Sequence, residues 1–245
     1  MNRRIQQLFA IVLHIRNFGD AHRIIEVLTA EEGRIAIVAR HARNSKKRFA
    51  GVLDLFANIE IEVTPTNKLW RLESARQIQP RLGLRTSLQR LIGAGMCCES
   101  VRLLVAEHQA APEIYQALAD ALDCLEAGDF IRASNFYPSL LCASGITPDF
   151  STCTCCGDTF FKAISFDCKY GGIVCSRCAP TLRPLPPGVA AAFSGTGCPD
   201  IHSANALVDC ALDWIESQTG RPLTSRRVTL EYNHSFLNSS GHNHA

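Results

Sequence analysis

Apolar and polar residues alternate with a period of two along the first eighty positions, which predicts short β-strands with one buried face. The clearest case lies at 58–63, where Ile59, Ile61 and Val63 alternate with Glu60 and Glu62. Similar runs occur at 8–15, 23–28, 34–40 and 70–73, which brings the expected number of strands to about five.

Gly33 lies between the second and third runs, where a hairpin needs a residue that tolerates a positive φ. Five antiparallel strands in fewer than ninety residues favour a small closed barrel, and the OB-fold is the common five-stranded barrel. We therefore expect residues 1–80 to form an OB-fold domain.

Beyond Pro80 the apolar period changes to that of an α-helix. Two amphipathic helices are expected, one before and one after Pro112, and a third helical stretch is expected at 130–143 despite Pro138. Residues 81–150 are therefore predicted to form a helical domain. The first apolar stripe comprises Leu88, Leu91, Ile92, Gly95, Val101, Leu104 and Val105, and the second comprises Ile114, Leu118, Ala121, Leu122 and Leu125.

A cysteine-rich segment at 151–182 interrupts the helical pattern, and several prolines after it predict a stiff connection. The C-terminal part of the helical domain is expected at 183–232. Its last amphipathic helix ends at Gly220, shortly before Pro222. The polar residues 233–245 predict a disordered tail. The apolar stripe of the last helix is Leu207, Cys210, Ala211, Trp214 and Ile215.

Composition and charge narrow the classes of function. The chain has 245 residues, 47% hydrophobic and 20% charged, as expected for a folded protein. It has neither an apolar run long enough to span a membrane nor a signal-peptide pattern, so we expect a cytoplasmic protein. Residues 1–90 contain 16 Lys and Arg against 8 Asp and Glu, whereas 91–245 contain 9 against 15. The basic first third predicts an anionic partner, and charge alone leaves open a nucleic acid or an anionic membrane.

Two Cys-x-x-Cys pairs are the most specific motif in the chain, with Cys153 and Cys156 in the first pair and Cys175 and Cys178 in the second. This spacing is typical of a zinc ribbon, and four thiolates leave no position for an activated water. We therefore expect one structural zinc ion, which contributes on the order of 10 kcal/mol to local folding. The alternatives are two disulfides, free thiols, or replacement of one ligand by the nearby Cys155 or Cys168.

A basic loop is expected after the third strand, with cations at Arg40, Arg43, Lys46, Lys47 and Arg48 and no acidic residue. A loop of this kind at the edge of a small barrel can follow a phosphate backbone, although it can also be an ordinary solvated loop. Arg16, Arg34 and Arg71 add positive charge on outward positions. The nearby aromatic residues are Phe18, Phe49, Phe56 and Trp70. Rings at this spacing are more typical of a core, and Phe49 is the candidate for base stacking.

Motifs of the common enzyme classes are absent from the sequence. It contains no phosphate-binding P-loop, dinucleotide fingerprint, Gly-x-Ser-x-Gly elbow or His-Glu-x-x-His pair. A zinc hydrolase or deaminase that acts on nucleic acid needs an open metal position and a nearby acid, and no His-x-Glu motif is present. We therefore expect a protein that is not an enzyme.

Several motifs, taken in their order and spacing, resemble the RecO family of bacterial DNA-repair proteins, which are recombination mediators. The resemblance extends from the N-terminus to about residue 230. The residues that carry it are Val12, Leu13 and His14 with Phe18, Leu28 and Thr29, Glu32 to Arg34, Val38 to Arg40, the basic loop, the cysteine pairs and Gly220 to Arg227.

This resemblance implies an α+β multidomain protein with an N-terminal OB-fold β-barrel, a mainly α-helical body and an inserted four-cysteine zinc module. It implies binding of single- and double-stranded DNA and annealing of complementary strands. It further implies that the protein acts with RecR to load RecA onto strands coated by SSB, that it is a monomer on its own, and that it is a cytoplasmic protein associated with the nucleoid. The family's DNA-contacting loop falls on Arg40, Arg43, Lys46, Lys47 and Arg48, and its zinc ligands fall on Cys153, Cys156, Cys175 and Cys178.

Two segments depart from the family pattern. Asp20 to Arg23 replace the usual small polar residues after the first strand, where the bounds of the strands are set. Arg40 and His41 replace the usual Lys-Gly, and a histidine is more restricted than glycine at positive φ. We therefore expect the loop to leave the barrel along a different path while it keeps its charge.

A protein-interaction scaffold that does not anneal DNA is the alternative function. In that case the helical body would bind a partner's tail. The two functions are compatible, because the acidic and apolar SSB tail would suit a groove between helices flanked by cations such as Arg102 and Arg132.

Overall fold

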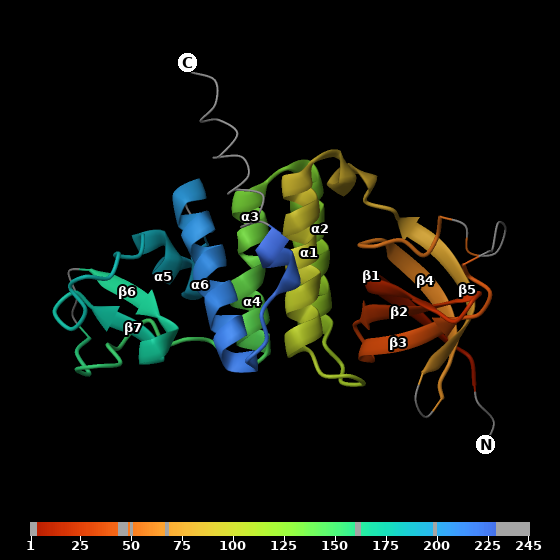
Figure 1. Cartoon of the computed structure of the whole chain (residues 1–245), viewed down its shortest axis with the longest axis horizontal. Coiled ribbons are helices and arrows are strands. Elements are labelled where there is room, and N and C mark those ends of the chain that lie inside the picture. Colours follow the sequence, from red (N-terminus) through yellow and green to blue (C-terminus); the bar gives the residue numbers. More distant parts are fainter. Residues whose placement is uncertain are drawn as a thin grey trace, which may run out of the picture.

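The computed structural model describes residues 4–43, 49, 51–66, 69–159, 163–197 and 200–228. Three parts follow one another along the long axis of the molecule (Figure 1). A β-barrel forms one end, a layer of helices forms the middle, and a small two-stranded sheet forms the other end. The disordered tail expected at 233–245 lies outside the described residues.

The N-terminal part is a closed barrel of the OB type. Its strands are β1 (Gln6–Phe18), β2 (His22–Thr29), β3 (Gly33–Ala39), β4 (Asn58–Thr64) and β5 (Trp70–Gln79), in the order β1-β2-β3-β5-β4. The expectation of antiparallel pairing throughout is wrong for one pair, because β3 and β5 run parallel. A pattern of alternating residues does not distinguish the two directions, because both have a side-chain period of two.

Inward residues of the barrel follow the predicted alternation. In β4, Ile59, Ile61 and Val63 are fully buried, and in β5 Trp70 and Leu72 are buried. At Gly33, φ is +61°, as the hairpin requires. The period of two therefore predicted the inner face of these strands correctly.

Strand β1 is buried on both of its faces near its middle. Ala10 and Val12 belong to the barrel core, whereas Ile11 and Leu13 pack against the helices. Strand β1 pairs with β2 on both sides of a register shift between Val12 and His14. The barrel and the helical body consequently share one continuous apolar contact.

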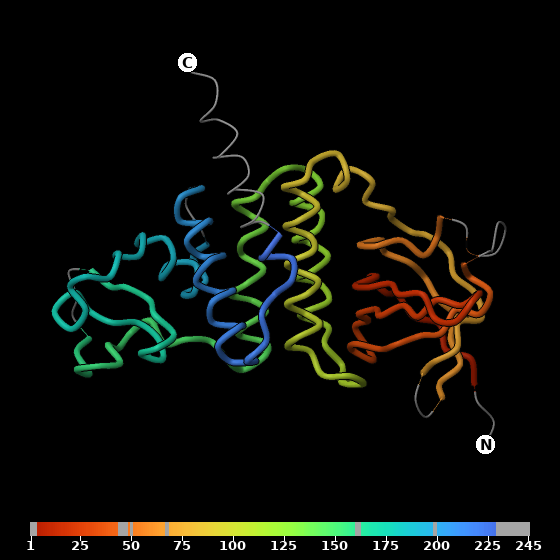
Figure 2. The backbone as a smooth tube through the Cα atoms, in the orientation of Figure 1, coloured from red at the N-terminus to blue at the C-terminus, as the bar shows by residue number. Residues whose placement is uncertain are grey.

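The helical body is assembled from η1 (Leu82–Thr86), α1 (Leu88–Leu104), α2 (Pro112–Ala127), α3 (Phe130–Ser134), α4 (Phe136–Ala143), α5 (Pro187–Phe193) and α6 (Ile201–Thr219). The predicted stripes of α2 and α6 are buried. Helix α6 ends at Gly220, where φ is +65°. The segment that follows turns back beside α1 (Figure 2), where Glu99 accepts hydrogen bonds from the backbone amides of Thr224 and Ser225 at 2.9 Å.

The buried face predicted for α1 is confirmed at Val101 and at Val105, directly after the helix, but is wrong in the first turns. Leu88 and Leu91 are 42% and 36% exposed, whereas the buried positions are Ala94, Cys97, Cys98, Ser100 and Val101. Apolar residues occur around much of this helix, so the sequence alone does not define which side faces the core. The neighbouring elements decide it.

The helix expected at 130–143 is divided in two. Helix α3 ends at Ser134 and α4 begins at Phe136, with Pro138 in the first turn of α4. A proline has no amide to donate to the carbonyl four residues earlier, and its ring crowds that carbonyl. Helix α5 begins at Pro187, inside the segment that the prolines predicted to be a stiff connection, since proline is well suited to the first helical turn.

Charged and backbone contacts fix the barrel to the body. Arg34 donates to the carbonyl of Val105 at 3.1 Å, and Arg102 donates to Glu26 at 2.8 Å. The backbone of Gly33 lies so close to the backbone of Gln109 that a Cβ built on the glycine would be 1.8 Å from the Gln109 carbonyl oxygen. These contacts join the ends of β2 and β3 to α1 and to the connection between α1 and α2.

A two-stranded sheet of β6 (Ile164–Asp167) and β7 (Gly172–Cys175), with the turn η2 (Cys168–Tyr170), forms the far end. Aromatic rings fix this sheet to the body: Phe150 stacks with Phe166 and Phe193, and Phe166 meets the edge of Trp214 at 5.7 Å. In the described part of the chain, no helix is long and apolar enough to cross a lipid bilayer.

Candidate nucleic-acid interface and cysteine cluster

The structure brings together the four cysteines of the Cys-x-x-Cys pairs. Cys153 and Cys156 lie in one knuckle, Cys175 ends β7, and Cys178 follows in a second knuckle. All four sulfur atoms lie within 4.8 Å of one another, and the sulfurs of Cys156 and Cys175 are 3.8 Å apart. Sulfurs bound about 2.3 Å from one tetrahedral zinc lie roughly 3.8 Å apart, so the donor set fits that metal.

Backbone amides prepare the sulfurs for a cation. The amide of Cys175 donates to Sγ of Cys153 at 3.3 Å, and this hydrogen bond lowers the pKa of the Cys153 thiol to about 6. The pKa of Cys175 is also lowered, mainly by the amide of Cys178. Hydrogen bonds to Cys156 and Cys175 raise the pKa of Cys178 to about 12, so a metal must displace the proton of this thiol.

Neighbouring residues complete the surroundings of the cluster. Arg177 pairs with Asp158 at 2.5 Å and places a guanidinium nitrogen 3.9 Å from Sγ of Cys156, which balances part of the thiolate charge. Cys155 is exposed, and Cys168 packs against the helical body. Among the described residues, neither of these two cysteines joins the cluster. Since all four sulfurs point to one centre, the arrangement offers a metal no open position for substrate.

The predicted basic loop is described only at its start. Arg40 and Arg43 are exposed, and neither has a carboxylate within ion-pair distance in the described part of the chain. Lys46, Lys47 and Arg48 lie outside the described residues.

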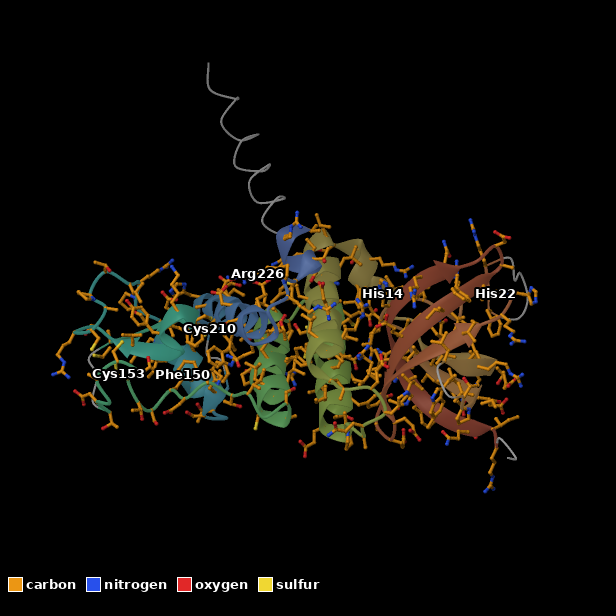
Figure 3. The ribbon with its side chains drawn as sticks, turned by 60° about the horizontal axis from the view of Figure 1, so that its bottom comes forward. His14, His22, Phe150, Cys153, Cys210 and Arg226 are labelled. Carbon is orange, nitrogen blue, oxygen red and sulfur yellow. The ribbon has the colours of Figure 1, made fainter. Side chains whose placement is uncertain are left out.

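Strand pairing places two more arginines at the same end of the barrel. Asn17 pairs with Arg23, Arg16 pairs with Ile24, and Arg23 pairs with Ala39 directly before the loop. Neither Arg16 nor Arg23 has an ion pair with a described carboxylate. Sequence reasoning missed Arg23, although its place at a strand end opposite the loop was a usable signal. Figure 3 shows this end at His22, remote from the helices, whereas His14 lies on the side that faces them.

Other barrel arginines differ in that they are neutralised. Arg34 pairs with Glu26 and Glu107, Arg71 pairs with Glu73, and Arg76 pairs with Glu60. Of the three outward cations expected to add charge to the surface, only Arg16 is therefore free of an ion pair within the described residues. We call Arg16, Arg23, Arg40 and Arg43 the cationic end. It is suited to hold a polyanion, because its cations have no competing internal partner among the residues described.

The turn between β1 and β2 holds the start of the basic loop. His41 has a φ of +56°, and its backbone amide donates to Nδ1 of His22 at 3.0 Å. The amide of Arg43 donates to the carbonyl of Ala21 at 3.1 Å. These two hydrogen bonds stabilise the restricted conformation expected for a histidine in place of glycine.

Aromatic residues near the loop are mostly buried. Phe49, Phe56 and Trp70 are 4% or 5% exposed and belong to apolar cores, so the choice of Phe49 as the base-stacking residue is wrong. Phe18 is 47% exposed at the end of β1. Phe18 therefore differs from the other three rings in its exposure, and the sequence does not show this difference directly.

The helical body contains a cavity of about 780 Å³ between α1, α3, α4 and α6. Arg226 lines it and is surrounded by Asp209, Asp213 and Glu216. Neither of the two cations expected to flank a groove lines this cavity. Arg102 is paired with Glu26, whereas Arg132 lies beside Asp129 and lines a second cavity, of about 590 Å³, between α2, α3 and α4. Apolar and polar side chains both line the cavity, and its arginine is surrounded by acidic groups.

Comparison with known proteins identifies relatives along nearly the whole chain. Residues 1–81 match the family model "Recombination protein O N terminal", and residues 85–194 match "Recombination protein O C terminal". The chain is 32% identical over 243 residues to the DNA repair protein RecO of Anaeromyxobacter sp. strain K, covering 90% of this chain and 94% of that protein. It is 35% identical over 180 residues to the DNA repair protein RecO of Pelobacter propionicus, covering 71% and 72%.

Proposed function

The chain belongs to the RecO family of DNA repair and recombination proteins, and from this premise we propose that it is a mediator that binds and anneals DNA. The single observation that carries the proposal is the cationic end, where Arg16, Arg23, Arg40 and Arg43 gather without carboxylate partners in the described residues. Arg16, Arg40 and Arg43 are exposed, whereas Arg23 is half-buried, and exposed cations without an ion pair attract phosphates of any sequence. Lys46, Lys47 and Arg48 belong to the same proposed interface.

Annealing follows from such a surface without catalysis. Two complementary strands repel each other through their phosphates, and cations that neutralise phosphates lower this repulsion. Contacts to phosphates carry no sequence information, so the surface accepts both strands and the duplex they form. The protein therefore acts as a mediator rather than as an enzyme.

A zinc ion held by Cys153, Cys156, Cys175 and Cys178 is the proposed cofactor. When bound, it supplies cross-links among two knuckles and β7, a segment with a small core of its own. Four sulfur ligands leave no coordination site for water, which assigns the ion a structural role.

The proposed partners are those of a RecO-type mediator. Single- and double-stranded DNA bind the barrel domain 1–80, and RecR and the SSB tail act with the protein in loading RecA. The helical parts 81–150 and 183–232 and the zinc module 151–182 support that domain. The chain is a monomer on its own and works in the cytoplasm at the nucleoid.

Annealing of complementary strands across a salt series tests the proposal. One variant carries Arg16→Gln, Arg40→Gln and Arg43→Gln. Its matched control carries Arg71→Gln, Arg76→Gln and Arg85→Gln, which removes the same charge from ion-paired arginines. The first variant is expected to anneal slowly and to lose about 0.7 in the salt slope of single-strand binding for each phosphate contact removed, while the control stays near the wild type.

Equal losses in both variants would contradict a localised interface. A further variant with Arg40, Arg43, Lys46, Lys47 and Arg48 all changed to Gln extends the test to the whole loop. If the folded, zinc-loaded protein does not bind DNA, the alternative of a protein-interaction scaffold prevails. The cavity between α1 and α6 is the observation that favours that alternative.

A further inference from the structure

An exposed aromatic ring lies on the cationic end. Phe18 is the last residue of β1, is 47% exposed, and pairs directly with His22 at the start of β2. Directly paired residues place their side chains on the same face of a sheet. His41 completes the group, because its ring meets the edge of the His22 ring with centroids 5.1 Å apart.

The register shows which face of the barrel carries this ring. Phe18 and Arg16 alternate on one face of β1, and Arg16 pairs with Ile24, which in turn pairs with Val38 of β3. Residues two apart share a face, so Arg40 continues that face beyond β3. This is the outer face of β1, β2 and β3, away from the barrel core that contains Ile25 and Ile37.

The helical body covers the other end of the same face. There Glu26 and Arg34 contact Arg102 and the carbonyl of Val105. The part left open holds Phe18 between exposed cations. In OB-folds generally, this face and the loop after the first strand are where oligonucleotides bind.

From these observations we propose that Phe18 is a stacking platform for an unpaired base of single-stranded DNA. The inference rests on the proposed function and adds a specificity-determining residue to it. Arg16 and Arg40 hold the flanking phosphates while one base lies on the ring. Bases in a duplex are already stacked on each other, so Phe18 favours single strands and contributes little to duplex binding.

The same strand supplies a matched control. Phe9 is also on β1 and is 50% exposed, but it pairs with Glu60, an acidic residue, rather than with a residue of the cationic end. Both phenylalanines are exposed, so truncation of either is expected to change folding stability little. Thermal unfolding of each variant checks this.

The experiment measures binding of full-length Phe18→Ala and Phe9→Ala to an oligothymidylate and to a duplex of mixed sequence. Phe18→Ala is expected to weaken single-strand binding by roughly 5-fold to 150-fold, the range that corresponds to the loss of one base–aromatic stack. Duplex binding stays within about twofold of the wild type. Phe9→Ala leaves both affinities unchanged.

A spectroscopic readout separates stacking from a general loss of surface. In Phe18→Trp, the oligothymidylate is expected to quench the added tryptophan emission. In Phe9→Trp, emission above the background of Trp70 and Trp214 stays constant. An oligonucleotide with abasic sites serves as the comparison for the Phe18→Trp variant. If it does not quench the emission, the contact is with the base.

The other outcomes overturn the inference. If Phe18→Ala binds both DNA forms normally while the variant with Arg16→Gln, Arg40→Gln and Arg43→Gln loses both, DNA binds this end without stacking, and Phe18 serves another partner. An equal loss for both DNA forms means that Phe18 only supports the surface. If the wild type binds neither DNA form, the proposed function itself fails.

Discussion

Arg81 shows how one side chain stabilises two restricted backbone positions. Arg81 and Phe56 are non-glycine residues with positive φ, at +49° and +69°. The Arg81 side chain is 1% exposed, and its guanidinium donates to Asp123 at 2.7 Å and to the carbonyl of Phe56 at 2.9 Å. Conformations of this kind cost of order 1–3 kcal/mol each and persist only when neighbours hold them.

The substitution Arg81→Met is expected to lower the free energy of unfolding by about 2–3 kcal/mol, since it leaves a buried carbonyl without its donor. Chemical denaturation measures the change. Arg85→Gln is the control, because Arg85 pairs with Asp54 at the surface and is 45% exposed. A loss of similar size in both variants would show that burial is not the cause.

A second residue-scale prediction concerns Gly33, which combines positive φ with a close neighbour. Gly33→Ala is expected to destabilise the protein by more than about 2 kcal/mol, because its Cβ would overlap the Gln109 carbonyl. Gly51 has φ of +72° with nothing within 4 Å of an added Cβ, so Gly51→Ala isolates the backbone strain alone. Comparable unfolding midpoints for the two variants would argue against the steric contact.

At the scale of elements, the contact between β2 and α1 depends on a carboxylate. Burial raises the pKa of Glu26, but the hydrogen bond and charge of Arg102, with His14 and Arg34, lower it overall below its ordinary value of 4.5. A depressed pKa stabilises the fold fully above pH about 4.5, and this stabilisation is lost as pH falls through the lowered value.

The variant Glu26→Gln is therefore expected to be about 2 kcal/mol less stable than the wild type near neutral pH. The difference shrinks below pH about 4.5 as Glu26 becomes protonated. Urea denaturation of both proteins at a series of pH values measures it. A difference that is constant down to strongly acidic pH would exclude the charge of Glu26 as its source.

Removal of the metal tests whether zinc stabilises the fold of the cysteine knuckles and β7. A chelator, or Cys175→Ser, is expected to unfold this sheet and to change the emission of Trp214, which touches Phe166 of β6. The barrel has a separate core and should keep its DNA affinity. Unchanged emission with complete loss of zinc would contradict a structural metal.

Regular periodicity made several elements predictable from sequence. The inner faces of β4 and β5 and the stripes of α2 and α6 follow from a period of two or 3.6, and the cysteine pairs follow from their spacing. The parallel closure of β3 on β5, the buried side of α1 and the burial of Phe49 depend on long-range packing. The neutralisation of Arg34 and Arg71 by distant or neighbouring acids was likewise invisible in a count of charges.

At the scale of the whole molecule, acidic and basic regions are separated in space as well as in sequence. The cationic end and the cysteine cluster lie at opposite ends of the long axis, with the helical body between them (Figures 1 and 3). The body therefore adds no described cation to the cationic end. It fixes the barrel through β2, β3 and the barrel face of α1.

If DNA binds at the cationic end as proposed, this geometry limits how much of a strand one molecule covers. With the strand held at the barrel tip, the occluded length equals the width of one small barrel rather than the length of the molecule. Neighbouring copies can then bind side by side along one strand, with their helical bodies directed away from it. Most of the sugar-phosphate backbone between them stays accessible to the complementary strand.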